Sequence, residues 1–179
     1  MTSPHDVVAF WRAAGPDRWF AKDADFDADI VRRFAQTHRA ALSGELNAWR
    51  GSDEGLLALV LVLDQFPRNM FRDDPRAFAS DEHARALANE AIARDLDTRS
   101  DAAMRPFIYM PLMHSENMHD QERCVALFEK AGIQENLHFA RLHADIIRRF
   151  GRFPHRNKVL GRTSSAEEQA FLDAGGFAG

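Results

Sequence analysis

The sequence has a single cysteine and no long hydrophobic run, and each scarcity excludes a class of protein. One cysteine cannot form an internal disulfide, and it cannot supply the cysteine pairs of a zinc ribbon. The longest unbroken apolar run covers residues 56–63, whereas a membrane-spanning helix needs about 20 such residues. The first six residues also lack the basic start and apolar stretch of a signal peptide. We therefore expect a soluble, cytoplasmic protein that does not associate with membranes.

The composition is that of an ordinary globular protein. Of the 179 residues, 45% are hydrophobic and 28% are charged, and the formal net charge is −4. A chain of this length can bury enough surface to form a core without disulfides or metals. No linker or low-complexity stretch divides the sequence, so we expect one domain covering residues 1–179.

Helix start and stop signals account for most of the chain. Ser3 precedes Pro4 as an N-cap precedes the first helical residue, and Ser165 with Glu168 forms a capping box. Glycines end four of the predicted helices: Gly15, Gly44, Gly132 and Gly151. No Asn-Gly or Asp-Gly hairpin pair and no sustained alternation of apolar and polar residues occurs. The predicted fold class is all-α, a single domain of antiparallel helix pairs.

Three helix boundaries are less obvious from the pattern. Residues 56–63 are uniformly apolar, and leucine outnumbers valine, so we predict a helix capped by Ser52 and buried on all sides. Pro67 biases the residue before it away from helical conformation, and the helix should therefore end near Gln65. Later in the chain, Ser115 is the expected N-cap of the helix that ends at Gly132.

The first polar segment of interest directly follows the buried helix, at residues 64–69. Asp64 comes after eight apolar residues, so its carboxylate must be paired, and Arg68 is the nearest cation. One interpretation is a structural Asp–Arg brace at a corner, and the other is a ligand site that includes Asp64, Arg68 and Asn69. The motif Phe-Pro-Arg-Asn is echoed at residues 153–157. The two motifs are either one shared way to turn the chain or two corners that meet at one pocket.

The second polar segment runs from residue 114 to residue 123. If Ser115 caps the helix, Glu116 and Asp120 lie one turn apart on the same face. Carboxylates beside a histidine suit general acid–base chemistry, which makes His114 and Glu116 candidate catalytic residues. The alternative is a capped helix with an acidic first turn. His114 and His119 are five residues apart and do not share a helix face, so we predict no metal site.

The third segment is basic in an otherwise acidic protein. Residues 138–162 contain seven Arg or Lys and one acidic residue, and arginines alternate with aromatic residues near the centre. They form either a solvated face, internal partners for the carboxylates, or an anion site. We expect Asp64 and Glu116 each to pair with one of four arginines: Arg68, Arg149, Arg152 or Arg156. His155 is a third catalytic candidate, because neighbouring positive charge should lower its proton affinity.

Several motifs together resemble the bacterial domain of unknown function 924 family. They are Phe10-Trp11, residues 15–20, residues 63–69, His114-Ser-Glu116 with Asp120-Gln121, residues 149–157, Gly161-Arg162, and residues 165–168 with the Gly-Gly-Phe end. The resemblance covers nearly the whole chain. It implies an all-helical fold similar to tetratricopeptide-repeat proteins, a right-handed helical array. It implies no established reaction, supplies no accepted catalytic residues, and suggests no cofactor.

Three functional hypotheses follow. The first is a site for a small anion or small ligand, with or without a reaction, in which an Asp/Glu/His segment faces an Arg/His segment. Its expected ligand-binding residues are Asp64, Arg68, Asn69, Asp120, Arg149, Arg152, Arg156 and Asn157. The second is a tetratricopeptide-like module that binds a peptide or protein partner, with the polar motifs as internal braces. Nucleic-acid binding through the basic segment is the least favoured, and exposed Phe and Met patches would be compatible with a homo-oligomer.

Overall fold

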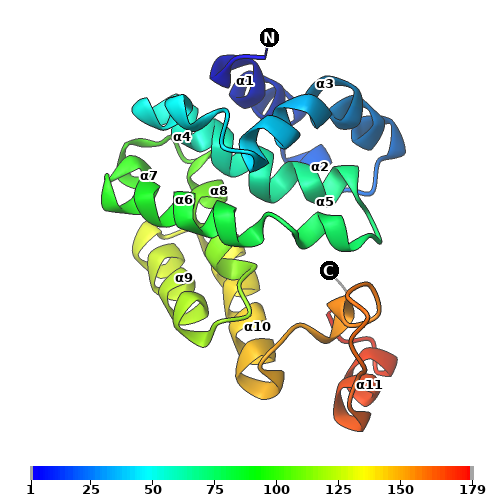
Figure 1. Cartoon of the computed structure of the whole chain (residues 1–179). Coiled ribbons are helices and arrows are strands. Elements are labelled where there is room, and N and C mark those ends of the chain that lie inside the picture. Colours follow the sequence, from blue (N-terminus) through cyan, green and yellow to red (C-terminus); the bar gives the residue numbers. More distant parts are fainter. Residues whose placement is uncertain (1, 178–179) are drawn as a thin grey trace. The chain divides into compact units, whose positions relative to one another are not determined.

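The computed structural model describes residues 2–177, and within them the chain folds into helices joined by loops, without a strand (Figure 1). The predicted all-α class is confirmed. The residues form two compact groups. The N-terminal group contains the chain up to Arg72 together with Arg76–Pro111, and the C-terminal group contains Asp73–Pro75 and the chain from Leu112 onward. A single domain over residues 1–179, and its tetratricopeptide-like array, stay predictions.

The N-terminal group is built around one long buried segment. Along this part of the chain the elements are α1 (Pro4–Ala14), α2 (Pro16–Trp19), α3 (Ala24–Leu42), η1 (Asn47–Gly51), α4 (Asp53–Val60), η2 (Leu61–Gln65), α5 (Phe66–Met70), η3 (Pro75–Phe78), α6 (Asp81–Ala93), α7 (Leu96–Arg99) and α8 (Arg105–Met113). The predicted caps are confirmed, since Ser3 accepts the N–H of Asp6 and Ser52 accepts that of Gly55. Residues 55–67 are all buried, as expected for a helix surrounded on every side.

Aromatic rings fill the space around this buried segment. The ring centroid of Phe66 lies 4.9 Å from that of Phe34 and 5.7 Å from that of Trp11, and the Trp11 ring meets Phe107 edge-on at 5.5 Å. Aromatic pairs in such tilted and edge-on geometries contribute beyond the area they bury. The core of the N-terminal group therefore joins α1, α3, α5 and α8.

The predicted helix end at Gln65 is wrong, because the chain continues helical through Pro67. Residues 61–65 widen into a π turn, in which the N–H of Phe66 bonds to the carbonyl of Leu61, and Pro67 falls in the first turn of α5. A proline has no N–H for the carbonyl four residues earlier, which here is that of Leu63. The hydroxyl of Ser80 donates to this carbonyl at 2.6 Å. A side chain from a later element thus replaces the bond that Pro67 cannot make.

The C-terminal group contains a helix hairpin followed by a structured loop. Helices α9 (Met118–Ala131) and α10 (Gln134–Phe150) lie side by side (Figure 1), and η4 (Pro154–Arg156) and α11 (Ala166–Asp173) follow. The predicted helix ends at Gly132 and Gly151 are confirmed, each with φ near +71°, a left-handed conformation that glycine adopts readily. Ile146, Ile147 and Phe153 form a buried apolar cluster in this group.

The predicted N-cap of α9 is wrong. Asn117 caps the helix by accepting the N–H of His119, whereas Ser115 accepts the N–H of Asn117 and donates its hydroxyl to Asp120 at 2.7 Å. Glu116 therefore lies before the helix, and it does not share a helix face with Asp120 as predicted. The capping box of Ser165 and Glu168 at α11 is present as predicted.

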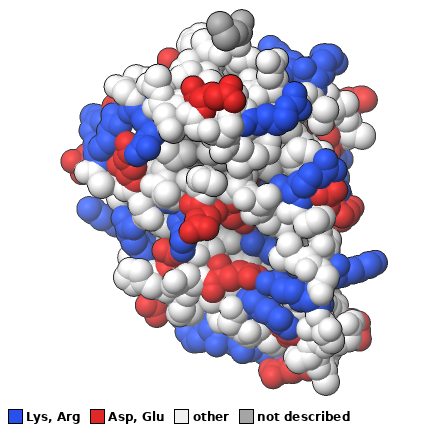
Figure 2. Space-filling model, in the orientation of Figure 1, with Lys and Arg blue, Asp and Glu red and all other residues white. Residues whose placement is uncertain are grey.

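Charged residues of both signs are interspersed on the face of the molecule that Figure 2 shows. Figure 2 shows blue and red side chains interspersed on the face in view, without a large area of one sign. Many of them form exposed ion pairs such as Arg12 with Asp101 and Arg141 with Glu129. Among the described residues, every helix is too short or too polar to span a lipid bilayer.

Candidate functional site

Glu116 connects the start of α9 with the loop that follows α10. Its carboxylate accepts the backbone N–H of Phe153 at 2.8 Å and two bonds from the guanidinium of Arg162, at 2.7 and 2.9 Å. Burial alone would raise the pKa of Glu116, but the bonds from Arg162 and Phe153 outweigh it and hold the pKa below its usual value. The predicted pairing of Glu116 with an arginine is confirmed. The partner, Arg162, is not among the four arginines expected.

Arg152 forms the second ion pair of this loop. Its guanidinium donates to both oxygens of Glu168, at 2.7 and 2.9 Å, and to the carbonyl of Thr163 at 2.8 Å. Glu168 is 3% exposed and also accepts the N–H of Ser165. The bond from Arg152 is the largest cause that lowers the pKa of Glu168, to about 2. Arg152 therefore acts within the fold, where it ties the loop to the N-terminus of α11.

Within the loop, Phe153, His155 and Arg156 lie together, and we name these three residues the His155 cluster. The guanidinium of Arg156, which is 7% exposed, lies 4.6 Å over the ring of Phe153. The imidazole of His155 is 5.6 Å from the same ring, and its Nδ1 is buried without a hydrogen-bond partner among the described residues. Burial, followed by the charge of Arg156, lowers the pKa of His155 to about 4. The predicted lowering of the His155 pKa is confirmed, although burial contributes more to it than the neighbouring charge does.

A second imidazole packs near the His155 cluster. His143 on α10 donates from Nδ1 to the carbonyl of Phe139 at 2.8 Å, which leaves Nε2 without a proton when the ring is neutral. Its ring centroid lies 5.4 Å from Phe153 and 4.6 Å from Phe177, and Phe177 also contacts His155 at 5.4 Å. The two histidines thus share an aromatic environment.

The remaining predicted residues of the C-terminal group have varied surroundings. Asn157 is 1% exposed; its amide nitrogen donates to Ser164 and Glu168, and its oxygen has no partner among the described residues. Arg149 is exposed and pairs with Glu167 at 3.1 Å. Asp120 is buried and accepts the Ser115 hydroxyl. His114, the residue before Ser115, is half-buried.

The corner at residues 64–69 belongs to the N-terminal group. Asp64 is fully buried, accepts the amide of Gln65 at 2.6 Å and lies 3.4 Å from Nη1 of Arg68, which confirms the predicted pair. Arg68 also forms a two-bonded pair with Asp81, at 2.9 and 3.1 Å. Asn69 donates to Asp27 at 2.8 Å. This corner and the His155 cluster lie in different compact groups, so their meeting at one pocket stays a prediction.

The sequence indicated which charged residues would form ion pairs, but it often did not identify the residue with which each one pairs. Arg162 was recognised only as part of the basic segment and of a family motif, Glu168 only as a capping residue and part of a family motif, and Asp81 not at all. Each is more than ten residues from its partner, and local spacing carries no signal for such pairs. Within residues 2–177, no group of three or more His, Cys, Asp or Glu is arranged to hold a metal ion. Burial raises the pKa of the Cys124 thiol, which opposes a nucleophilic role.

Comparisons with known proteins agree on one family. The family model described as bacterial protein of unknown function, DUF924, matches residues 7–176. A solved structure of a protein of unknown function from Agrobacterium tumefaciens, ATU0120, is similar with a TM-score of 0.92 and 45% sequence identity. The match covers 96% of this chain and 97% of that one. No curated protein matches the chain.

Proposed function

The chain belongs to the DUF924 family of bacterial proteins of unknown function, and we propose that it binds a small anion, a carboxylate or a phosphate, at the His155 cluster. One observation carries the proposal. His155 has its pKa lowered to about 4 and keeps Nδ1 buried without a partner, directly beside the buried guanidinium of Arg156. A neutral imidazole and a permanent cation together offer N–H donors to an anionic oxygen without two repelling charges.

The surroundings of the cluster support binding. A guanidinium has five N–H donors, so Arg156 can hold a ligand oxygen in addition to the contacts it makes within the fold. Its burial strengthens a charge-assisted hydrogen bond relative to the same bond in water. The pairs Glu116–Arg162 and Arg152–Glu168 fix the loop on both sides of the cluster. A site held by such bonds loses little conformational entropy when a ligand binds.

The proposal reassigns some of the predicted ligand-binding residues. Arg152 and Asn157 position the loop through Glu168, and Arg149 lies on the exposed side with Glu167. Glu116 is engaged with Arg162 as a carboxylate, so it supports the loop and does not serve as an acid. His155 is unprotonated at neutral pH, and a bound anion would favour its protonated form.

The first prediction is that a bound anion raises the pKa of His155. Negative charge favours the protonated imidazole, so a pKa near 4 in anion-free buffer should rise by about 1 unit or more. The Cε1–H signal of His155, followed by NMR against pH in sodium phosphate, in sodium acetate and in chloride alone, measures the shift. Comparison of phosphate with acetate identifies the preferred anion.

Matched variants make this experiment specific. Arg156→Met should abolish the shift, whereas Arg149→Met, which removes an exposed arginine, should leave it unchanged. His155→Gln, which keeps Arg156, should lose the increase in melting temperature that the anion gives to the unaltered chain. Dispersed amide spectra establish that each variant is folded. If neither anion moves the His155 pKa, or if Arg156→Met shows the full shift, the proposal is wrong.

A second function is favoured by a different observation. Arg68, Arg152 and Arg162 each form two-bonded pairs with carboxylates, as braces inside a helical scaffold would. A helical module that binds a peptide or protein can contain such braces without a small-anion site. The same titration separates the two functions. If the protein is only a module of this kind, the His155 pKa should not change when phosphate or acetate is added.

A further inference from the structure

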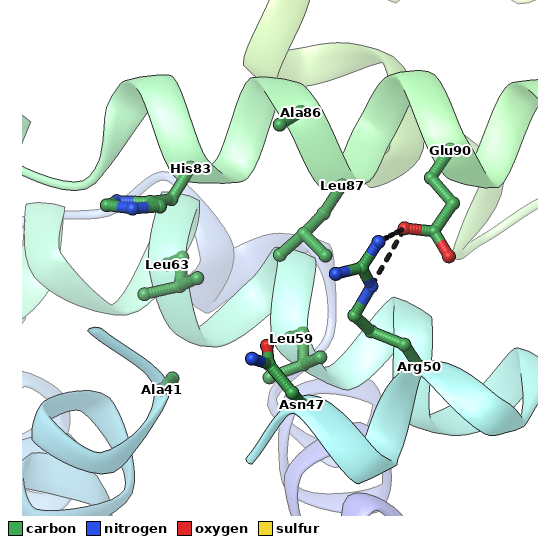
Figure 3. A pocket seen from close by; sticks show the side chains of 9 residues that line it. All are labelled: Ala41, Asn47, Arg50, Leu59, Leu63, His83, Ala86, Leu87 and Glu90. Atoms are coloured by element: carbon green, nitrogen blue, oxygen red, sulfur yellow. Dashed lines mark hydrogen bonds and ion pairs between the residues drawn. The ribbon is translucent and has the colours of Figure 1, made fainter. Parts of the chain in front are cut away.

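A cavity of about 140 Å³ lies in the N-terminal group. It is lined by the end of α3, by η1, by the buried segment α4–η2 and by α6, and it opens to solvent beside the exposed residues Asn47, Arg50 and Ala86 (Figure 3). Leu59, Leu63 and Leu87 supply its aliphatic surface. The other lining residues are Ala41, Asn47, Arg50, His83, Ala86 and Glu90. Aliphatic side chains accompanied by a few polar groups are typical of small-molecule sites.

Arg50 directs one nitrogen into this cavity. Its Nε and Nη2 both donate to Oε2 of Glu90, at 2.9 and 2.6 Å. In Figure 3 the remaining guanidinium nitrogen, Nη1, points away from Glu90 and toward the leucine-lined space. Glu90 therefore fixes the guanidinium plane, so that an N–H donor faces the aliphatic cavity. A ligand oxygen placed there would complete the hydrogen bonding of Arg50.

The charged residues that form a network with Arg50 and Glu90 favour an anionic ligand over a neutral one. Arg94 lies 3.5 Å from both Glu90 and Asp53, and Arg99 pairs with Asp53 at 2.7 Å. Three guanidiniums in this network thus face two carboxylates, which leaves one excess positive charge. A single carboxylate on Arg50 would balance it, whereas a doubly charged phosphate would reverse its sign.

We propose that this cavity binds a short branched aliphatic carboxylate, with its oxygen on Arg50 and its branch among Leu59, Leu63 and Leu87. The size agrees, because an apolar cavity of about 150 Å³ accommodates a molecule as large as benzene. The carboxylate of a five-carbon branched acid would lie near Asn47 and Arg50. The inference goes beyond the proposed anion site, from which it differs in location and in its requirement for an aliphatic group.

Isovalerate is the probe, titrated into the full chain and followed by amide NMR. We expect saturable shifts in the residues that line the cavity, with a Kd on the order of millimolar for so small a ligand. Acetate lacks the branch and 3-methylbutan-1-ol lacks the carboxylate, so each should bind at least about ten-fold more weakly. Equal binding of either analogue would overturn the assignment of the ligand class.

Variants distinguish this cavity from the His155 cluster. Arg50→Met should weaken isovalerate binding at least about ten-fold, and Arg12→Met, which removes a similarly exposed ion-paired arginine, should not. Ala86→Phe should fill the cavity and prevent binding, whereas Ala93→Phe, at the exposed end of the same helix, should not. Arg156→Met should leave the cavity shifts intact even if the anion site fails. Absence of saturable shifts at the cavity, or unchanged binding by Arg50→Met, overturns the inference.

Discussion

Asp64 illustrates what a buried carboxylate requires of its neighbours. It follows eight apolar residues and has no exposed surface, yet it accepts the amide of Gln65 and lies 3.4 Å from the guanidinium of Arg68. Arg68 in turn holds Asp81 through two further bonds. Removal of one member of such a group leaves a buried charge with fewer partners than it needs, which costs more than the pair contributed.

Replacement of this carboxylate should therefore be strongly destabilising. Asp64→Ala should lower the free energy of unfolding by about 3–5 kcal/mol, because Arg68 loses one of its two acidic partners in a buried site. Urea denaturation followed by circular dichroism measures the change.

An exposed ion pair supplies the control for Asp64→Ala. Glu129 pairs with Arg141 at 3.0 Å, with both side chains more than half exposed, so Glu129→Ala should cost less than about 1 kcal/mol. Equal losses in the two variants would show that Asp64 is not held as the geometry indicates.

At this scale the sequence predicted that charges are paired but not always with which partner. Asp64 and Arg68 are four residues apart, so spacing was enough to identify them. Glu116 and Arg162 are 46 residues apart, and their meeting depends on how the loop after α10 folds back. Arg152 and Arg149 were therefore expected beside Glu116, while in the structure they bind Glu168 and Glu167.

Among the elements, the π turn at residues 61–65 shows why a proline did not end the helix. Pro67 restricts the preceding residue and lacks an N–H, and these local effects predicted a stop near Gln65. The chain instead widens by one residue, and Ser80 supplies the donor to the carbonyl of Leu63. The compensating group lies 17 residues from that carbonyl, outside the range of any local rule.

The Ser80 hydroxyl should therefore stabilise the π turn specifically. Ser80→Ala should lower the free energy of unfolding by about 1–3 kcal/mol, since a buried carbonyl loses its donor. In a Pro67→Ala background the restored N–H can serve Leu63, so the same substitution should cost about 1 kcal/mol less.

Thermal or urea unfolding of the four proteins in this double-mutant cycle gives the coupling energy between Ser80 and Pro67. A cost of Ser80→Ala that does not depend on residue 67 would mean that the two groups do not share the Leu63 carbonyl.

Over the whole molecule, the all-α class was predictable because its signals are local. Caps such as Ser3, Ser52 and Ser165, and the glycine at 132, act within one or two turns of each helix end. Ser115 failed as a cap because Asn117, two residues later, is equally suited to cap a helix, and the hydroxyl of Ser115 binds Asp120 instead. The cavity that Arg50 lines was not predicted, since its lining residues come from five separate elements.

Local sequence signals and contacts between distant residues also differ in what they show about charge. The sequence shows a basic segment at residues 138–162 in a protein of net charge −4. In the structure, Arg148, Arg149, Arg152 and Arg162 of this segment are each paired with a carboxylate. A cation already neutralised by an adjacent carboxylate releases few counterions from DNA, and counterion release supplies most of non-specific affinity.

We therefore predict that the protein does not bind duplex DNA at physiological salt, where non-specific binders show a Kd of roughly 10⁻⁴ to 10⁻⁶ M. Fluorescence anisotropy of a short labelled duplex measures this. Asp145→Asn with Glu167→Gln removes the partners of Arg148 and Arg149 at the exposed end of α10, and this variant should gain weak binding that declines as salt rises. Micromolar binding by the unaltered chain would show instead that the basic segment remains available to phosphates despite its paired carboxylates.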